Sequence, residues 1–155
     1  ISFGTTGATG RASGWACDVR KRHPYAMYDK VDFKEIIHTG GDCYSRLLVR
    51  LEEIVESIRI IEQLIDNIPG GEYRTKTKPI IKLPEGVYSA SVEGSRGEFG
   101  VFIESHGDKN PYRMKFRPMG LPLIAAAQKI MKGCKIADLI TIGASLDYVI
   151  PDIDR

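Results

Sequence analysis

The side chains most able to do chemistry in this chain lie in its last eleven residues, SLDYVIPDIDR. The charged residues Asp147, Asp152 and Arg155 alternate there with apolar ones such as Val149. Charges in a low-dielectric site act strongly on a nearby redox group, and apolar side chains can line a wall for a flat ring. The segment has no cysteine and offers no thiolate to a metal ion. Residues of these types could act on a neighbouring group by electrostatics; the alternative is a tail that only packs and forms salt bridges.

Arg96 is the second candidate, in the run Gly94-Ser-Arg-Gly97. The two glycines allow backbone conformations that bring a cation close to a buried acceptor. The alternative is an ordinary turn arginine that faces solvent. In both interpretations Arg96 lies in a turn between two strands.

Three glycines near the amino terminus, Gly4, Gly7 and Gly10, resemble a dinucleotide-binding loop in their spacing. Such a loop lets a pyrophosphate approach bare backbone at the start of a helix. Here Gly14 and Trp15 interrupt the helix that should follow, and the chain has no G-x-x-x-x-G-K-[ST] phosphate loop. We therefore expect these glycines to pack their backbone closely against another element.

The composition is that of an ordinary globular chain. Of 155 residues, 43% are apolar and 27% are charged, and a formal net charge of +2 is too small to imply nucleic acid or a membrane surface as a partner. The apolar runs are far shorter than the roughly 18 residues of a membrane span. The basic run at 20–23 fits a solvated face or an acidic protein partner. Because the chain begins with Ile1, we expect it to be part of a longer protein.

The three cysteines, Cys17, Cys43 and Cys134, are scattered and form no C-x-x-C pair. Zinc or an iron–sulfur cluster needs about four clustered ligands, and an odd number of thiols argues against a disulfide framework. We expect three buried or partly buried thiols in a reducing compartment.

The elements that must position these residues include a long helix, predicted over 43–68. Asp42 is a good N-cap residue, and Pro69-Gly-Gly71 supplies the stop signals. Between them, apolar residues recur every three or four positions and form one stripe: Leu47, Leu51, Ile54, Ile58, Ile61 and Ile65. Before this helix, we predict irregular structure over 1–13 and a short helical stretch over 13–28, interrupted at Pro24.

After a lysine-rich connector, the periodicity changes to that of strands. In YRMKFR at 112–117, apolar and basic residues alternate strictly, which is typical of a sheet with one solvated face. We predict strands at 86–93, 100–105 and 112–117, then short helices at 121–131 and 135–142. The predicted fold class is α+β: a long amphipathic helix, a small antiparallel meander and short C-terminal helices, in a single domain over 1–155.

Four runs, in order along the chain, resemble the quinone-site D subunit of NADH:quinone oxidoreductase, respiratory complex I. They are GRASGWACDVR at 10–20, GDCYSR at 41–46, VEGSRGEFGV at 92–101 and the tail at 145–155. The third run departs from the family pattern, which has proline where this chain has Ser95. In the related [NiFe]-hydrogenase large subunits the tail carries a C-x-x-C pair, which is absent here.

The resemblance implies the C-terminal part of a [NiFe]-hydrogenase-large-subunit-like fold, without the N-terminal histidine and tyrosine that meet the quinone headgroup. It implies a subunit of a proton-translocating enzyme, forming part of the quinone-reduction site next to the terminal iron–sulfur cluster of a neighbouring subunit. Asp147, Val149, Asp152, Arg155 and Arg96 would lie near that cavity and cluster. The resemblance assigns no catalytic residue and no metal ligand to this chain.

By the same resemblance, the chain binds no cofactor itself, and the complex uses NADH, quinone and the iron–sulfur clusters of neighbouring subunits. The implied partners are other peripheral-arm subunits, including the one that holds the terminal cluster; nucleic acid and a transmembrane segment are not implied. The expected location is peripheral, on the cytoplasmic face of the inner (plasma) membrane. We expect the isolated chain to be inactive.

Two alternatives stay open. One is a membrane-bound hydrogenase-type subunit, or a ferredoxin- or F420-linked oxidoreductase subunit, on the same scaffold. A [NiFe] centre needs thiolates at both ends of its subunit, and the tail offers none, which argues against true hydrogenase activity. The other is a purely structural subunit that bridges its neighbours.

Overall fold

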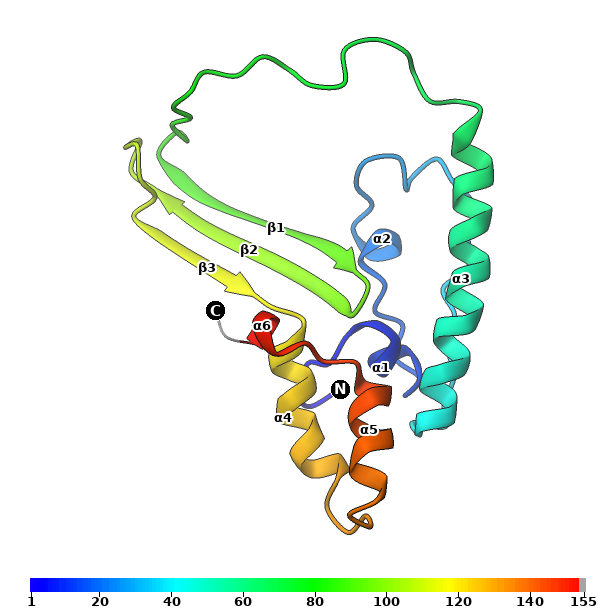
Figure 1. Ribbon diagram of the computed structural model, residues 1–155. Helices are drawn as coiled ribbons and strands as arrows, with labels where there is room; N and C mark the ends of the chain where they lie inside the picture. Colours follow the sequence, from blue (N-terminus) through cyan, green and yellow to red (C-terminus); the bar gives the residue numbers. More distant parts are fainter. Residues whose placement is uncertain (154–155) are drawn as a thin grey trace.

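The computed structural model describes residues 1–153 and has the predicted α+β architecture (Figure 1). A three-stranded antiparallel sheet, in the order β1-β2-β3, lies on one side, and the long helix α3 stands on the other. Helices α1 and α2 lie between them, and α4 and α5 pack together near the foot of α3. The elements are α1 (Gly7–Arg11), α2 (Val19–Arg22), α3 (Cys43–Ile65), β1 (Gly86–Gly94), β2 (Gly97–Ser105), β3 (Arg113–Arg117), α4 (Gly120–Ile130), α5 (Asp138–Leu146) and α6 (Ile150–Ile153).

Helix α3 begins where the sequence predicted. The carboxylate of Asp42 accepts a hydrogen bond from the backbone N–H of Ser45 at 2.7 Å. This bond holds the pKa of Asp42 below its ordinary value. The helix ends at Ile65 rather than at 68, because Pro69 disfavours helical conformation in the residue before it and the last turn unwinds.

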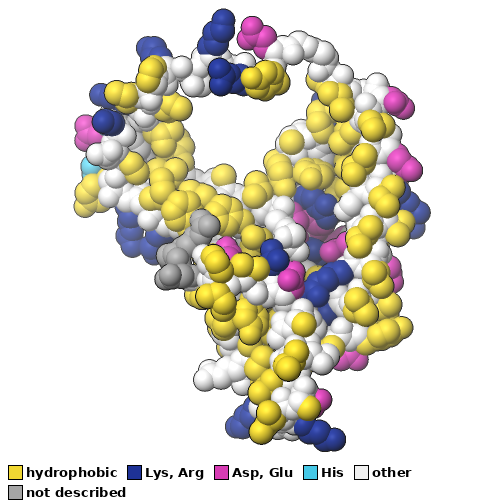
Figure 2. All heavy atoms as spheres, in the orientation of Figure 1, with side chains coloured by type: hydrophobic (Ala, Val, Ile, Leu, Met, Phe, Trp, Pro, Cys, Tyr) yellow, Lys and Arg dark blue, Asp and Glu magenta, His cyan; other side chains and the backbone are white. Residues whose placement is uncertain are grey.

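The apolar stripe that identified α3 does not face the core of this chain. Its six residues, from Leu47 to Ile65, are each 49% to 59% exposed. The face that packs carries Val49 and Ile60 together with the polar Arg46 and Glu56. Periodicity therefore identified the helix, but its apolar stripe lies on a surface that residues 1–153 leave uncovered (Figure 2).

The sheet is a meander, and its register explains the alternation in the sequence. β1 and β2 form a hairpin closed by the pair Gly94 and Gly97, and β3 pairs with the other edge of β2. The basic side chains of β3 lie on one face. The apolar ones lie on the other, where Phe116 stacks on Phe99 with ring centroids 6.2 Å apart. The predicted antiparallel meander is confirmed, although β3 is exposed on both faces and the middle strand starts at Gly97, three residues earlier than predicted.

The amino-terminal part differs from the prediction. Residues 1–13, expected to be irregular, contain α1, and the helical stretch expected over 13–28 is reduced to the four residues of α2. Helix α2 is short for two local reasons. Asp18 caps its start by accepting from the N–H of Arg20 at 2.9 Å, and Pro24 forces the residue before it out of helical conformation.

The C-terminal helices are present with shifted ends. Helix α4 corresponds to the prediction at 121–131, whereas α5, predicted at 135–142, starts at Asp138 and continues to Leu146. The short helix α6 in the tail was not predicted; its second residue is Pro151, which fits the first turn of a helix. No helix within residues 1–153 combines the length and the apolar character needed to cross a membrane.

Two small apolar clusters form the core. One joins α1 to α3 and the other joins α4 to α5; their buried members are Ala8, Ala12 and Val49 in the first, and Ala127, Ile142 and Leu146 in the second. The alanines allow α1 to approach α3 closely. Of the cysteines, Cys17 is buried and Cys43 partly buried, but Cys134 is exposed, contrary to expectation.

Candidate functional site

The structure brings two sequence-predicted residues, Arg96 and Asp147, into contact across 51 positions of the chain. Nε of Arg96 donates to the backbone carbonyl of Asp147 at 2.6 Å and lies 3.3 Å from its carboxylate. Asp147 closes α5 in the left-handed conformation, with φ 54°, which is uncommon for residues other than glycine but is adopted by aspartate more often than by most. Because Arg96 bonds to its carbonyl, Arg96 is not a turn arginine that merely faces solvent. The two side chains stay 29% and 43% exposed, so the pair is accessible from outside this chain.

The turn that carries Arg96 is fixed by α1. A Cβ on Gly7 would lie 2.6 Å from the backbone of Arg96 and Gly97, so only glycine allows this approach. Beyond the turn, Oγ1 of Thr6 accepts from the N–H of Glu98 at 2.8 Å. The expectation that the amino-terminal glycines pack closely against another element is confirmed for Gly7. It is wrong for Gly4, where a Cβ would meet nothing within 4 Å, and Gly10 packs only against its own segment, at Thr5, Cys17 and Trp15.

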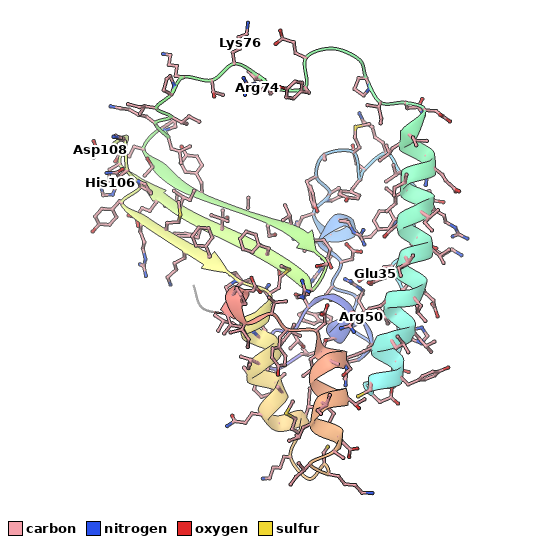
Figure 3. The ribbon with its side chains drawn as sticks, in the orientation of Figure 1. Glu35, Arg50, Arg74, Lys76, His106 and Asp108 are labelled. Atoms are coloured by element: carbon pink, nitrogen blue, oxygen red, sulfur yellow. The ribbon has the colours of Figure 1, made fainter. Side chains whose placement is uncertain are left out.

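Two further arginines reach the same end of α5, and the sequence reasoning missed them as site residues. Nε of Arg46 donates to Oγ of Ser145 at 3.0 Å. Nη2 of Arg50, the residue labelled beside α3 in Figure 3, donates to the backbone carbonyl of Ser145 at 2.6 Å. Ser145 lies in the last turn of α5, where unpaired carbonyls and the helix dipole favour cations. The sequence feature that could have identified them as a pair was their spacing of one helical turn on α3.

A buried group of charges lies behind the turn. Arg11 is 3% exposed and pairs with Glu53 of α3 and with Glu93 of β1. Burial by itself would lower the pKa of Arg11, but the two carboxylates outweigh it and raise the pKa above its ordinary value. Burial raises the pKa of Glu93, although Arg11 and the N–H of Val19 oppose the shift. The arginine therefore stays charged and links α1, α3 and the hairpin.

The segment before α2 is held by Glu35, whose side chain lies on the side facing α3. Glu35, which lies between α2 and α3 in Figure 3, accepts from the backbone N–H groups of Cys17 and Asp18 at 2.6 and 2.8 Å. Burial raises the pKa of Cys17 to about 11, so its thiol is protonated at neutral pH. This cysteine therefore serves packing.

Two other predicted site residues that the structure describes, Asp152 and Val149, form no hydrogen bond or ion pair with Arg96. The carboxylate of Asp152 accepts from the N–H of Gly120 at 2.7 Å, at the start of α4, where a negative charge is favourable. Val149 is partly buried, and its carbonyl accepts from the N–H of Asp152 at 3.1 Å. Arg155 lies outside the described residues. The tail thus has two anchors, one at the hairpin turn and one at α4.

The arrangement can supply fixed charges and a rigid backbone. Within residues 1–153, no group of three histidine, cysteine or acidic side chains lies together in a way that could hold a metal ion. A groove of about 840 Å³ lies on the polar face of the sheet, lined by residues such as Ser91, Phe102 and Lys115. Its described lining includes neither Arg96 nor Asp147, so the groove is separate from the site at the end of α5.

Comparison with known proteins gives a consistent result. The chain matches the family model of the 49 kDa subunit of respiratory-chain NADH dehydrogenase in two overlapping stretches, 1–84 and 78–155. It is 72% identical over 155 residues to the C/D subunit of NADH-quinone oxidoreductase from Phocaeicola vulgatus, covering all of this chain and 30% of that protein. It is 45% identical over 154 residues to the D subunit of the Desulfotalea psychrophila enzyme, covering 99% of this chain and 41% of that protein. The chain thus spans less than half the length of these relatives.

A solved structure is also similar. It belongs to the membrane-bound sulfane sulfur reductase, an archaeal respiratory membrane complex. The TM-score is 0.91 at 37% sequence identity, and the match covers 100% of this chain and 43% of that one. The likeness therefore extends over every element described above.

Proposed function

The chain belongs to the family of the 49 kDa subunit of respiratory-chain NADH dehydrogenase, and we propose that it forms part of the quinone-reduction site of such an enzyme. We place the site where Arg96 meets Asp147, next to the terminal iron–sulfur cluster of a neighbouring subunit. The observation that supports this most is the contact itself, because the resemblance assigned both residues to the cavity independently. The scaffold we propose is the C-terminal part of a [NiFe]-hydrogenase-large-subunit-like fold.

The proposed role of the residues follows from charge. Reduction of a quinone places negative charge on its oxygens until protons arrive, and a fixed cation nearby stabilises that charge. Arg96 is such a cation, and Asp147 holds it in a single orientation through the 2.6 Å bond to its carbonyl. Val149, two residues further on, is suited to an apolar wall against the ring. Asp152 would act on the site only by holding the tail to α4.

The proposal extends to partners and location. We propose that this chain binds no cofactor of its own, and that electrons from NADH reach it through the iron–sulfur clusters of other peripheral-arm subunits. The complex would translocate protons and would carry this subunit peripherally, on the cytoplasmic face of the inner (plasma) membrane. The isolated chain would then be inactive, because it contains neither an electron donor nor the rest of the cavity.

A second candidate is supported by the solved relative. At 37% identity, a chain of a sulfane sulfur reductase shares this fold, so the scaffold also occurs in a respiratory membrane complex named for a different acceptor. The 72% identity to an NADH-quinone oxidoreductase subunit favours quinone for this chain. An assay of the purified complex with each acceptor separates the two: NADH-driven sulfane sulfur reduction without quinone reduction would support the second candidate.

The test of the quinone site uses the intact complex carrying Asp147→Asn or Val149→Met. We expect NADH:quinone activity to fall by about tenfold or more, because a charge or an apolar surface at the reacting ring is altered. NADH oxidation by ferricyanide, which draws electrons upstream, should stay unchanged and serves as the control. Unchanged quinone kinetics in a properly assembled complex would instead assign the tail to packing, as a purely structural role requires.

A further inference from the structure

Glu93 is a buried carboxylate that joins three elements just before the turn of Arg96. Its side chain is 4% exposed, and one oxygen accepts from Nη1 of Arg11 at 2.7 Å, at the end of α1. The other oxygen accepts from the N–H of Val19 at 3.0 Å, at the start of α2. Its own backbone N–H donates to the hydroxyl of Tyr25 at 3.1 Å. The quinone site proposed above does not include Glu93.

The turn is held on both of its strands: α1 contacts β1, and Thr6, the residue before α1, contacts β2. Ahead of the turn, Arg11 binds Glu93; beyond it, Thr6 accepts from the N–H of Glu98. Arg11 also pairs with Glu53, so the same helix ties the turn to α3. Moving the turn relative to α3 would require a buried ion pair to break, which leaves an uncompensated charge and is strongly unfavourable.

We propose that Glu93 is a positioning residue, whose pair with Arg11 fixes the turn so that Arg96 meets Asp147. This inference rests on the proposed function, since it takes Arg96 and Asp147 as part of the quinone site. The contacts at stake are the 2.6 Å bond to the carbonyl of Asp147 and the 3.3 Å approach to its carboxylate. A displacement of about 1 Å would end the second contact, and misplacement of that size can slow a reaction about a hundredfold.

The test is a double-mutant cycle in the intact complex, with Glu93→Gln, Asp147→Asn and both together. We expect Glu93→Gln alone to lower kcat/KM for quinone about tenfold while NADH:ferricyanide activity is unchanged. In the Asp147→Asn background, the same change should lower it by clearly less than tenfold, because the ion pair between Arg96 and the carboxylate is already lost and only the bond to the backbone carbonyl remains. Glu98→Gln is the matched control: Glu98 lies directly across the hairpin from Glu93, its side chain is 31% exposed, and its carboxylate pairs with Arg117 at 3.5 Å, while the change leaves its backbone bond to Thr6 in place. It should change kcat/KM by less than about twofold.

Each other outcome overturns the inference in a recognisable way. Equal losses in both backgrounds would mean that Glu93 acts independently of Asp147. A loss for Asp147→Asn with no effect of Glu93→Gln would reject the positioning role and leave the proposed function intact. No loss for any variant would reject the proposed function as well. If Glu93→Gln does not assemble, Glu93→Asp, which keeps the charge on a shorter side chain, enters the same cycle; failure of both to assemble would make Glu93 a folding determinant and overturn the inference.

Discussion

Gly7 shows how much a single missing side chain can determine. Its φ of 66° lies in the left-handed region, and a Cβ there would meet the backbone of Arg96 and Gly97 at 2.6 Å. Gly4 has nearly the same φ, 67°, but a Cβ on it would meet nothing within 4 Å. A side chain at either position would strain the left-handed backbone, but only at Gly7 would it also clash with a neighbour. Comparing substitutions at the two positions therefore separates backbone strain from steric clash.

Replacing Gly7 should therefore be costlier than replacing Gly4. We expect Gly4→Ala to reduce the free energy of unfolding by about 1 kcal/mol, which is the cost of a left-handed alanine. Gly7→Ala should cost about 3 kcal/mol or more, because the turn or α1 must also move. Thermal unfolding of the full-length protein measures both, and equal losses would contradict the packing described here.

Sequence reasoning found some residues of the site and missed others. Arg96 and Asp147 were found because the resemblance to a known family places them near its cavity. Arg46 and Glu93 also lie in runs that resemble the family, but the resemblance gave them no role, and the partners of Arg46, Arg50 and Glu93 lie 99, 95 and 82 positions away in the sequence. A basic side chain on a helix looks the same in sequence whether it faces solvent or the end of another helix. Only the fold distinguishes the two cases.

Helix α3 illustrates what local patterns can and cannot determine. Its start followed from Asp42, since capping depends on residues three positions apart. Its buried face did not follow from the pattern, because the apolar stripe is exposed and α1 and α5 pack against a face that carries Arg46. Hydrophobic periodicity reports that a face will be covered, and it leaves open which part of the protein covers it.

Arg46 should be the main polar determinant of the packing of α3 on α5. It is 2% exposed and bonds to Ser145, to the carbonyl of Gly41 and to Sγ of Cys43. We expect Arg46→Ala to reduce the free energy of unfolding by about 3 kcal/mol, since it removes a buried side chain together with its hydrogen bonds to Ser145, Gly41 and Cys43. Glu62→Ala, on an exposed position of the same helix, should change it by less than about 0.5 kcal/mol. Chemical denaturation of both variants in the full-length protein tests this, and similar small effects would show that Arg46 is dispensable.

The molecule as a whole leaves large apolar surfaces uncovered. One is the stripe of α3, and the other is the apolar face of the sheet, where Met114 and Phe116 are 44% and 47% exposed. Figure 2 shows apolar side chains along both. Apolar patches of this kind mark sites of association. The order and type of the main elements could be predicted from the local sequence. What covers these faces could not, because local periodicity does not identify a packing partner.

The isolated chain should therefore self-associate. We expect sedimentation velocity to show species larger than a monomer of 17.2 kDa at micromolar concentration. The double change Leu51→Gln and Ile58→Gln, in the middle of the stripe, should shift the distribution towards monomer. The control is Ile136→Gln with Ile140→Gln, two apolar residues that are 87% and 82% exposed outside the stripe. A monomeric unmodified chain, or an equal effect of both pairs, would contradict this prediction.

The connector between α3 and β1 arches away from both (Figure 1), and every residue from 66 to 82 is exposed. A Cβ on Gly70 or Gly71 would meet nothing within 4 Å. Doubling the length of such a loop costs only about 0.6 kcal/mol in closure entropy, so its length is nearly free of constraint. In evolutionary terms, insertions and deletions can accumulate here without disturbing the turn where Arg96 meets Asp147. For the experimenter, the same segment is the natural place to introduce an epitope or a fluorophore into the assembled enzyme.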